Sequence, residues 1–267
     1  MTPHAPPPAV PAATILLLRD AAAGAGPALE VLMVERGAGL EFAGGALVFP
    51  GGRIDPADGD PVWAERALGL DDDAALNAAR VAAAREAFEE VGVLLATKDG
   101  APVSGALAAK LGAARAAVEA DAALFAPLLA EHGLRLDLRA LTAFSRWVAP
   151  EVIPKRFDTH FFLAAAPADQ TPSPDGSEAC ACLWMRPLDA LANRSAGRRR
   201  VIFPTARNLE LLSLSADVAA ARSDAAARPI EPVHISVEVR DGQKVVTIPD
   251  HLGYPVTAED FELAMRN

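Results

Sequence analysis

Cysteine is scarce in this chain, which has two in 267 residues, Cys180 and Cys182. They alternate on a predicted strand, and residues two apart on a strand rarely form a disulfide. The five histidines include no pair spaced four apart, so neither residue type completes a zinc site. The sequence therefore predicts reduced cysteines that pack within the fold, and it argues against a disulfide-linked or zinc-based protein.

Long apolar runs and an excess of positive charge are also missing. No apolar run reaches the length of a transmembrane helix, and residues 1–12 lack the charged start and apolar core of a signal peptide. We expect a disordered proline and alanine tail there, and a cytoplasmic protein that binds no membrane. Lysine and arginine number 25 against 35 aspartates and glutamates, a formal net charge of -10, which argues against binding of nucleic acid.

The chain also has no G-x-S-x-G segment and no P-loop, but it concentrates carboxylates on one predicted helix. The run DDDAALNAARVAAAREAFEE predicts a helix over residues 74–91. At about 100° per residue, Glu86, Glu89 and Glu90 share one face of it and apolar residues share the other. Arg85 can pair with Glu89, and a divalent cation would offset the remaining charge. A solvated acidic face is the alternative.

Upstream of this helix, the segment FPGGRIDPAD places two adjacent glycines before an aspartate. Paired glycines permit positive φ and close approach of the backbone, so a carbonyl there can reach a metal or a phosphate. Together with REAFEEVGV, the segment resembles the Nudix box, G-x5-E-x7-R-E-U-x-E-E-x-G-U, where U is a bulky aliphatic residue. The matching positions are Gly52, Arg85, Glu86, Glu89, Glu90, Gly92 and Val93.

The chain departs from the box at three points. Asp58 replaces the first glutamate, Ala87 replaces the first aliphatic residue, and 26 residues (59–84) stand where the family has seven. The excess indicates an insertion, which is tolerated because the entropy of loop closure grows slowly with length. With it, the chain resembles the long branch of Nudix proteins related to peroxisomal acyl-coenzyme A diphosphatases. Four later segments extend this resemblance to about Leu212: FSRWVAP, RFDTHFFLA, CLWMRPLDAL and FPTARNLELL.

The resemblance implies an α/β fold, the Nudix-type α/β/α sandwich with a mixed sheet, an insertion inside the box and extra helices. We expect a Nudix hydrolase domain over 13–225 that includes an inserted helical segment at about 100–135, broken near Pro127. Residues 226–267 are predicted to form a C-terminal β-hairpin extension packed on the domain, with an Asp-Gly turn. Further expected elements are strands at 140–149, 157–166 and 179–186 and helices at 187–194 and 205–222.

The resemblance also implies the roles of the box residues. Glu86, Glu89 and Glu90 would hold Mg²⁺ or Mn²⁺ with help from the Gly51 carbonyl, and Arg85 would orient the cluster. Such ions neutralise the oxygens of a phosphoanhydride and lower the pKa of the attacking water. The box therefore predicts a metal-dependent hydrolase.

In this family a glutamate in a later loop sometimes serves as the catalytic base, and Glu178 is the candidate here. A solvated loop residue is its alternative, in which case Glu89 or Glu90 takes the role. The candidates for substrate binding are Arg36, Gly52, Arg156 and Asp158. The last two either grip a phosphate or form a local pair at the start of a strand. The run Arg198–Arg200 either contacts the extra phosphate of coenzyme A or forms a solvated basic turn.

These features predict hydrolysis of a phosphoanhydride in a small, nucleotide-derived substrate, with coenzyme A or acyl-coenzyme A preferred. A dinucleotide or nucleotide-sugar pyrophosphatase is the alternative, because Val34, Gly37 and Glu41 depart from the upstream motif of related coenzyme A diphosphatases. A non-catalytic Nudix-fold binding module is a third reading, which the retained box glutamates disfavour. The sequence leaves a homodimer open.

Overall fold

The computed structural model describes residues 8–21, 29–37, 39, 43–150 and 156–265. The strands of its central sheet are β1 (Val10–Asp20), β2 (Leu29–Arg36), β3 (Leu47–Val48), β4 (Gly51–Arg53), β9 (Thr142–Val148), β10 (Phe157–Ala165), β11 (Ala179–Met185) and β12 (Pro232–His234). They follow the order β11-β2-β1-β10-β9-β12, with β3 beside β2 and β4 beside β1. β1 and β10 are parallel and most other pairs are antiparallel, so the sheet is mixed.

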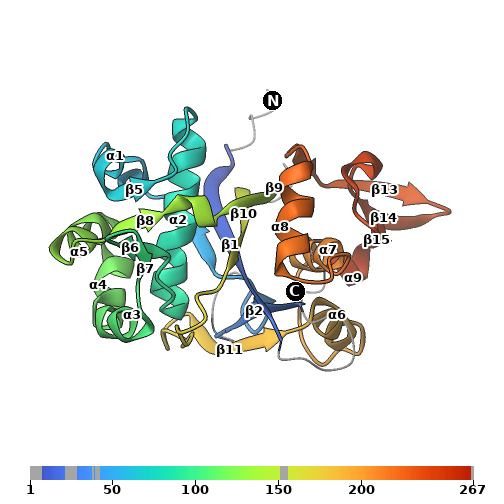
Figure 1. Cartoon of the computed structure of the whole chain (residues 1–267). Coiled ribbons are helices and arrows are strands. Elements are labelled where there is room, and N and C mark those ends of the chain that lie inside the picture. Colours follow the sequence, from blue (N-terminus) through green and yellow to red (C-terminus); the bar gives the residue numbers. More distant parts are fainter. Residues whose placement is uncertain (1–7, 22–28, 38, 40–42, 151–155, 266–267) are drawn as a thin grey trace.

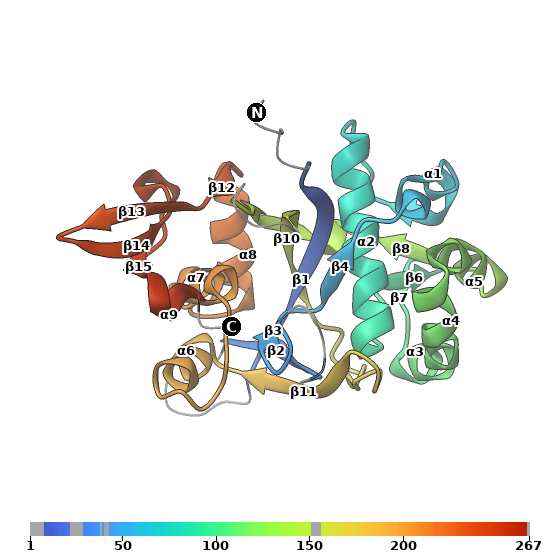
Figure 2. The same ribbon diagram turned by 180° about the vertical axis from the view of Figure 1, so that it is seen from behind.

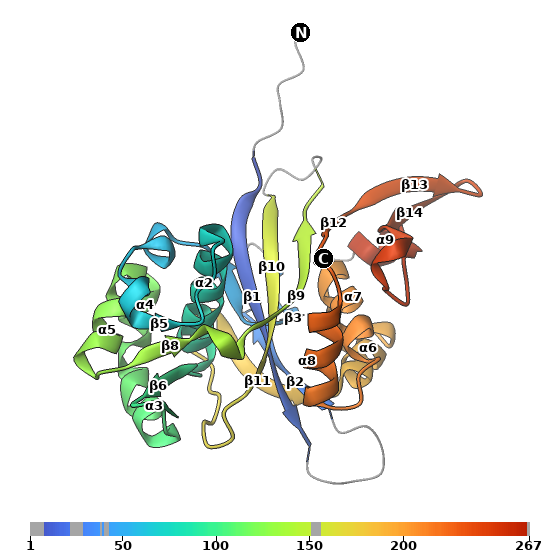
Figure 3. The same cartoon turned by 45° about the horizontal axis from the view of Figure 1, so that its top comes forward.

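Helices cover both faces of this sheet, which confirms the predicted α/β/α sandwich (Figure 3). β1 begins inside the segment 1–12 that was expected to be a disordered tail. Val10–Ala12 pair with Phe157–Thr159 of β10, and this backbone ladder explains why the segment is a strand. The part of the expected tail at residues 1–7 lies outside the described residues.

One face of the sheet is covered by α2 (Ala74–Val91), which has the predicted bounds. The Asp73 side chain accepts hydrogen bonds from the backbone N–H groups of Ala75 and Leu76, and Gly92 ends the helix at φ 69°. The side chains that α2 turns toward the sheet are mainly alanines, among them Ala79, Ala82, Ala83 and Ala87. Because these side chains are small, the helix can lie close to β1 and β4 (Figure 2).

The other face packs against α6 (Pro187–Ser195), α7 (Phe203–Leu212) and α8 (Val218–Ala227), which share a core with β1, β2 and β10. The prediction of one helix over 205–222 was wrong, because the chain breaks between α7 and α8. Asp217 caps α8 through a bond from the Ala220 N–H, and Asp20 accepts from the Val218 N–H. No helix in the described part of the chain combines the length and the apolar character that crossing a bilayer requires.

A second unit lies beyond α2, on the side away from the sheet (Figure 1). Its elements are η1 (Pro56–Gly59), α1 (Trp63–Arg66), β5 (Ala67–Leu68), β6 (Ala96–Lys98), β7 (Ala101–Pro102), α3 (Gly105–Leu111), η2 (Gly112–Ala114), α4 (Arg115–Ala120), η3 (Ala122–Leu124), α5 (Phe125–Glu131), β8 (Arg135–Asp137) and η4 (Leu138–Ala140). β5, from the box insertion, pairs with β8, so the insertion and the helical segment fold together.

This second unit has its own apolar core, which includes Phe88 of α2 stacked on Phe125 at a ring distance of 5.5 Å. The helical segment breaks at Asp121 and not, as predicted, near Pro127. Asp121 has an extended backbone at φ -148° and caps η3. Pro127 lies in the first turn of α5, where the absence of a backbone N–H is tolerated.

The C-terminal residues form β13 (Ser236–Arg240), β14 (Gln243–Thr247), η5 (Asp250–Leu252), β15 (Ala258–Asp260) and α9 (Phe261–Met265). β13 and β14 form the predicted hairpin, and its turn residues Asp241 and Gly242 have φ values of 50° and 80°. β15 pairs with β14. The Glu259 carboxylate joins this small sheet to α6, because it accepts two bonds from Arg194 at 2.6 and 2.7 Å.

The Arg194–Glu259 pair should contribute measurably to stability. Its side chains are 10% and 9% exposed, so Glu259→Gln would leave a nearly buried guanidinium with a neutral partner. We expect the free energy of unfolding to fall by about 2 kcal/mol. Denaturant titration would measure it, with Glu262→Gln on the exposed surface of α9 as the matched control. Equal effects of the two substitutions would contradict a stabilising role for the pair.

Candidate active site

The charged residues of the box are buried in the last two turns of α2. Arg85, Glu86, Glu89 and Glu90 are between 4% and 8% exposed. A solvated acidic face is therefore wrong for this helix. The carboxylates are packed against β4 and the loops around it, so their charge must be met from inside the protein or by a ligand.

The Arg85 guanidinium lies inside the carboxylate cluster. Nη1 donates to Glu86 Oε1 at 3.0 Å and to Glu89 Oε2 at 2.9 Å, so the predicted pair with Glu89 is present. Nη2 also donates to the Arg53 carbonyl at 2.9 Å. Burial alone would lower the pKa of Arg85, but the hydrogen bond to Asp58 and the surrounding carboxylates raise it above its ordinary value. The guanidinium is therefore charged.

Asp58 occupies the position of the first box glutamate, and its contacts show what it does there. It is 2% exposed and accepts from both Nε and Nη2 of Arg85 at 2.9 Å. The Asp55 N–H donates to the same carboxylate at 2.8 Å, which closes a capping box on η1. The structure thus uses Asp58 to hold the arginine, and η1 brings it within reach.

The two glycines of β4 allow the strand to approach its neighbours closely. A Cβ atom on Gly52 would lie 2.4 Å from Glu86 Oε1, and one on Gly51 would lie 2.5 Å from the Ala13 carbonyl oxygen. A side chain at either position would push the strand or the carboxylate away. Gly52 thus lies against the Glu86 carboxylate and Gly51 lies against β1, and a metal contact from the Gly51 carbonyl stays a prediction.

Glu178, in the loop between β10 and β11, reaches the cluster through Arg36. Arg36 Nη2 lies 2.9 Å from Glu178 Oε2, and Arg36 Nη1 lies 3.9 Å from Glu90 Oε1. The Gly37 N–H donates to the Glu178 carbonyl at 2.9 Å. Arg36 and Glu178 therefore lie beside the box although they are remote from it in sequence, and the Glu178 side chain is 45% exposed. Its role as a base stays a prediction.

Burial makes the box carboxylates weaker acids than free glutamate. Burial raises the pKa of Glu86 to about 8, with Arg85 acting against it. Burial also raises the pKa of Glu89, and it raises the pKa of Glu90 well above the ordinary value, where the charge of Glu86 adds to the effect and Arg36 opposes it. Glu90 Oε2 is buried and has no hydrogen-bond partner among the described residues. The cluster therefore has less positive charge than its carboxylates require.

No group of three or more His, Cys, Asp or Glu side chains in the described ranges is arranged to hold a metal ion. The contacts of Arg85 explain this, because its Nη1 takes oxygens of both Glu86 and Glu89. The donors are nevertheless those that a hard divalent cation prefers, and Glu90 Oε2 lacks a partner in the described part of the chain. The residues therefore supply the kind of oxygen ligands that a divalent cation needs. To bind one, Glu86 and Glu89 would have to turn part of the way from Arg85.

Asp158 forms an ion pair with Arg146, and a role of Asp158 and Arg156 in substrate binding stays a prediction. Both oxygens of Asp158 accept from Arg146, at 2.8 and 2.7 Å, and this bond lowers the pKa of Asp158. The Arg156 Nε donates to the Ala149 carbonyl at 3.2 Å. β10, which carries Asp158, pairs with the edge of β1 opposite to β4. The structure thus gives Asp158 a local pair with a different arginine, and it does not bring Asp158 onto the box.

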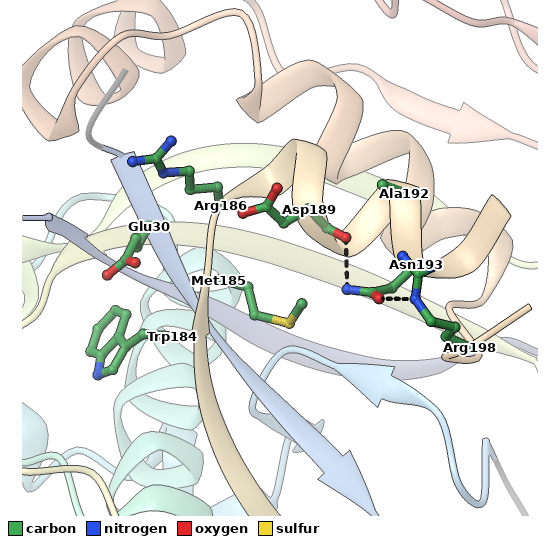
Figure 4. Close-up of a pocket in the computed structure, with 8 residues that line it drawn as sticks. All are labelled: Glu30, Trp184, Met185, Arg186, Asp189, Ala192, Asn193 and Arg198. Carbon is green, nitrogen blue, oxygen red and sulfur yellow. Dashed lines mark hydrogen bonds between the residues drawn. The ribbon is translucent and has the colours of Figure 1, made fainter. Parts of the chain in front are cut away.

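The basic run Arg198–Arg200 forms a partly exposed turn whose three side chains each contact a neighbouring part of the protein. Arg199 forms an ion pair with Glu35, and Arg200 Nη1 donates to the Gly44 carbonyl at 2.8 Å. Arg198 donates to Asn193 at 2.8 Å beside a cavity of about 410 Å³ (Figure 4). Trp184 and Met185, at the end of β11 remote from Glu178, line this cavity, so it is separate from the carboxylate cluster.

Sequence patterns missed two residues that hold the end of α2. Arg115 Nε donates to the Glu89 carbonyl at 2.7 Å, and the Gln170 side chain bonds both the N–H and the carbonyl of Leu94 at 2.8 and 3.1 Å. These contacts cross 26 and 76 residues of sequence. No local periodicity carries a signal for them.

The fold is an α/β/α sandwich. At the end of one helix, a buried arginine and three glutamates lie beside a strand that contains two adjacent glycines. Together these features define a Nudix hydrolase. A family model described as the NUDT19 Nudix domain matches residues 69–205, and the chain belongs to this family. The assignment confirms the resemblance drawn from the box and from the later segments.

Three comparisons support the same family. The chain is 29% identical over 208 residues to the acyl-coenzyme A diphosphatase NUDT19 of Gallus gallus, a match that covers 61% of this chain and 55% of that protein. It is 31% identical over 207 residues to the Homo sapiens protein of the same name, covering 60% and 54%. The crystal structure of a NUDIX hydrolase from Alicyclobacillus acidocaldarius superposes with a TM-score of 0.68 at 32% identity, covering 83% of this chain and 99% of that one. The chain spans about half the length of the curated relatives it matches.

The raised pKa of Glu86 predicts that the metal-free protein loses stability as the pH rises. Between the ordinary value of 4.5 and about 8, the folded protein keeps a proton that the unfolded chain has released. The free energy of unfolding therefore falls across this window, and Glu86→Gln should remove part of that decline. Denaturant titrations with EDTA at about pH 5 and about pH 8 would measure it. The same decline in wild type and variant would contradict the assignment to Glu86.

Proposed function

We propose that this chain hydrolyses the diphosphate linkage of coenzyme A or acyl-coenzyme A, with Mg²⁺ or Mn²⁺ held by the box glutamates. The observation that carries the proposal is the buried carboxylate of Glu90, whose Oε2 has no hydrogen-bond partner among the residues described. A buried carboxylate without its full set of partners is unfavourable unless a cation meets it. Divalent cations that prefer oxygen ligands fit this need.

The residues that would hold the ions are Glu86, Glu89 and Glu90, with the Gly51 carbonyl as a further ligand. When bound, the ions would neutralise phosphate charge and lower the pKa of the attacking water. Arg85 would keep its two bonds to Asp58 while it yields part of its contact with Glu86 and Glu89. This second anchor explains how the arginine can remain in place and orient the carboxylates.

The remaining side chains have separate tasks in the proposal. Arg36, which lies between Glu90 and Glu178, offers positive charge to a substrate phosphate. Glu178 accepts the proton of the attacking water, with Glu89 or Glu90 as the other candidate. Gly52 leaves the room that the Glu86 carboxylate needs. Each task uses a contact or a clearance that the described residues provide.

The names of the relatives support coenzyme A derivatives as the substrate class. Of the residues in the motif that precedes the box in related coenzyme A diphosphatases, some support this proposal and others do not. Arg36, which the chain retains, reaches the cluster, whereas Val34, which replaces a threonine, is 1% exposed and packs in the core below α2. Val34 therefore serves as a packing residue in this chain. Glu41 lies outside the described residues.

The reaction predicts a particular pair of products. Water forms a bond to one phosphorus of the diphosphate, and the bond from that phosphorus to the bridging oxygen breaks. Coenzyme A then gives adenosine 3',5'-bisphosphate and 4'-phosphopantetheine, and an acyl-coenzyme A gives the S-acyl form of the second product. Incubation with Mg²⁺ or Mn²⁺ and mass analysis of the products would test this. Free coenzyme A with a carboxylic acid, or no cleavage at the diphosphate, would overturn the proposal.

Metal binding can be tested without substrate. Saturation with a ligand at about 100 times its Kd stabilises a folded protein by about 2.7 kcal/mol, so Mg²⁺ or Mn²⁺ should raise the Tm relative to EDTA. Glu90→Gln should reduce this rise, because an amide oxygen is a weaker ligand for a hard cation. Glu65→Gln, at an exposed position of α1, is the control and should keep the full response. Equal responses in both variants would contradict a metal site at Glu90.

A further inference from the structure

The C-terminal turn of α2 is held from outside by two other parts of the chain. The last carbonyls of a helix have no partners within it, and the dipole makes this end negative. The Glu89 carbonyl accepts from Arg115 Nε at 2.7 Å, and the Val91 carbonyl accepts from the Ser173 N–H at 3.0 Å. Arg115 is the first residue of α4, which lies beside this end of α2 (Figure 1). Its positive charge is thus placed where carboxylates and the helix end both need it.

Arg115 also joins the two holding segments to each other. Its Nη1 donates to Ser173 Oγ at 3.2 Å, so one guanidinium bridges the catalytic helix and the loop between β10 and β11. From the same helix α4, the Glu119 carboxylate accepts a bond from Ser177 Oγ at 3.4 Å. The loop is therefore attached to α4 at both ends of the short run from Ser173 to Ser177.

Glu178 directly follows this run, and its position depends on the conformation of the loop. The carboxylate of Asp175 accepts from the N–H groups of Ser177, Glu178 and Ala179 at 2.7, 3.1 and 2.9 Å. Asp175 thereby folds the loop into a tight turn, and Gly176 takes φ 85° within it. The bond from the Gly37 N–H to the Glu178 carbonyl attaches the far end of this turn to β2, and the contacts of Ser173 and Ser177 attach its near side to α2 and α4.

We propose that Arg115 is a positioning residue for the reaction: by bridging the Glu89 carbonyl and Ser173, it sets the loop so that Glu178 lies beside Glu90 and Arg36. The proposal rests on the proposed function, in which Glu178 accepts the proton of the attacking water. It also gives the inserted helical unit a task in the site, because α4 belongs to that unit. A displacement of about 1 Å at a reacting group can lower a rate by about 100-fold, so a loss of this bridge is expected to be visible in turnover.

The position of the loop can be tested without any substrate. Arg115→Ala should speed hydrogen exchange in the amides of residues 173–179 by about tenfold or more, because the loop opens more often. Arg135→Ala is the matched control, since Arg135 Nη2 also donates to a main-chain carbonyl of the same unit, that of Ala67, at 2.7 Å. Exchange in 173–179 that is unchanged by Arg115→Ala, or raised equally by Arg135→Ala, would overturn the proposal even if no substrate had been found.

A double-mutant cycle tests whether Arg115 acts through Glu178. Arg115→Ala should lower kcat by about 10- to 100-fold with KM within about threefold, and it should cause no further loss in a Glu178→Gln background. Losses that multiply in the double variant would show that Arg115 acts independently of Glu178 and would overturn the proposal. So would a rise in KM at unchanged kcat, because Arg115 Nη2 lacks a partner among the described residues and could bind substrate directly.

The conservative variant separates geometry from charge. Arg115→Lys keeps the positive charge but cannot reach the Glu89 carbonyl and Ser173 Oγ together with the fork of a guanidinium. The kcat of Arg115→Lys should therefore stay nearly as low as that of Arg115→Ala. Wild-type turnover in this variant would mean that charge alone matters at position 115, which contradicts a role in positioning. If neither wild type nor variants cleave a phosphoanhydride, the proposed function fails, and the exchange experiment still decides whether Arg115 holds the loop.

Discussion

The buried guanidinium of Arg85 is the interaction on which the rest of this structure depends. One side chain bonds Asp58, Glu86, Glu89 and the Arg53 carbonyl, and these partners come from α2, β4 and η1. Without it, several carboxylates would lie in a low-dielectric environment with no counter-charge, which is strongly unfavourable. Arg85 therefore allows the acidic residues to be buried together, and it fixes the approach of β4 to the helix. Gly52 of β4 leaves the room that the buried Glu86 carboxylate needs.

The Glu90 carboxylate has less positive charge close to it than the other carboxylates of the cluster. Arg85 donates to Glu86 and Glu89, while the cation nearest to Glu90 among the ion pairs of the described residues is Arg36, 3.9 Å away. A protein selected for stability alone would satisfy Glu90 or replace it, because a buried oxygen without a partner is destabilising. Nudix hydrolases act on anionic substrates, and a site that is short of cations can accept them with its ligand. The buried Glu90 Oε2, which has no hydrogen-bond partner in the described part of the chain, is consistent with this use.

Local patterns predicted much of this fold and part of its site. α2 was predicted with its bounds because cap, alanine run and stop are adjacent in sequence, and the Asp-Gly turn marked the hairpin for the same reason. Asp158 was less accessible to such reasoning, because its partner Arg146 comes from β9 and is set by strand register. Arg115 gave no signal at all, since nothing in an alanine-rich helix distinguishes the arginine that reaches a distant carbonyl. Contacts of this type depend on how units pack, which one sequence does not show.

Phe88 has a consequence for how this protein could be recombined with its relatives. It lies between Ala87, which packs on the sheet, and Glu89, which belongs to the cluster, yet its ring stacks on Phe125 in the core of the second unit. The inserted unit therefore does not end at the boundaries of its own segments. A chimaera that exchanges the unit between two family members would have to carry the residue at position 88 with it, in the middle of the catalytic helix. The boundary between the central sheet domain and the inserted unit thus runs along one side of α2. No division of the sequence between two consecutive residues separates the two parts.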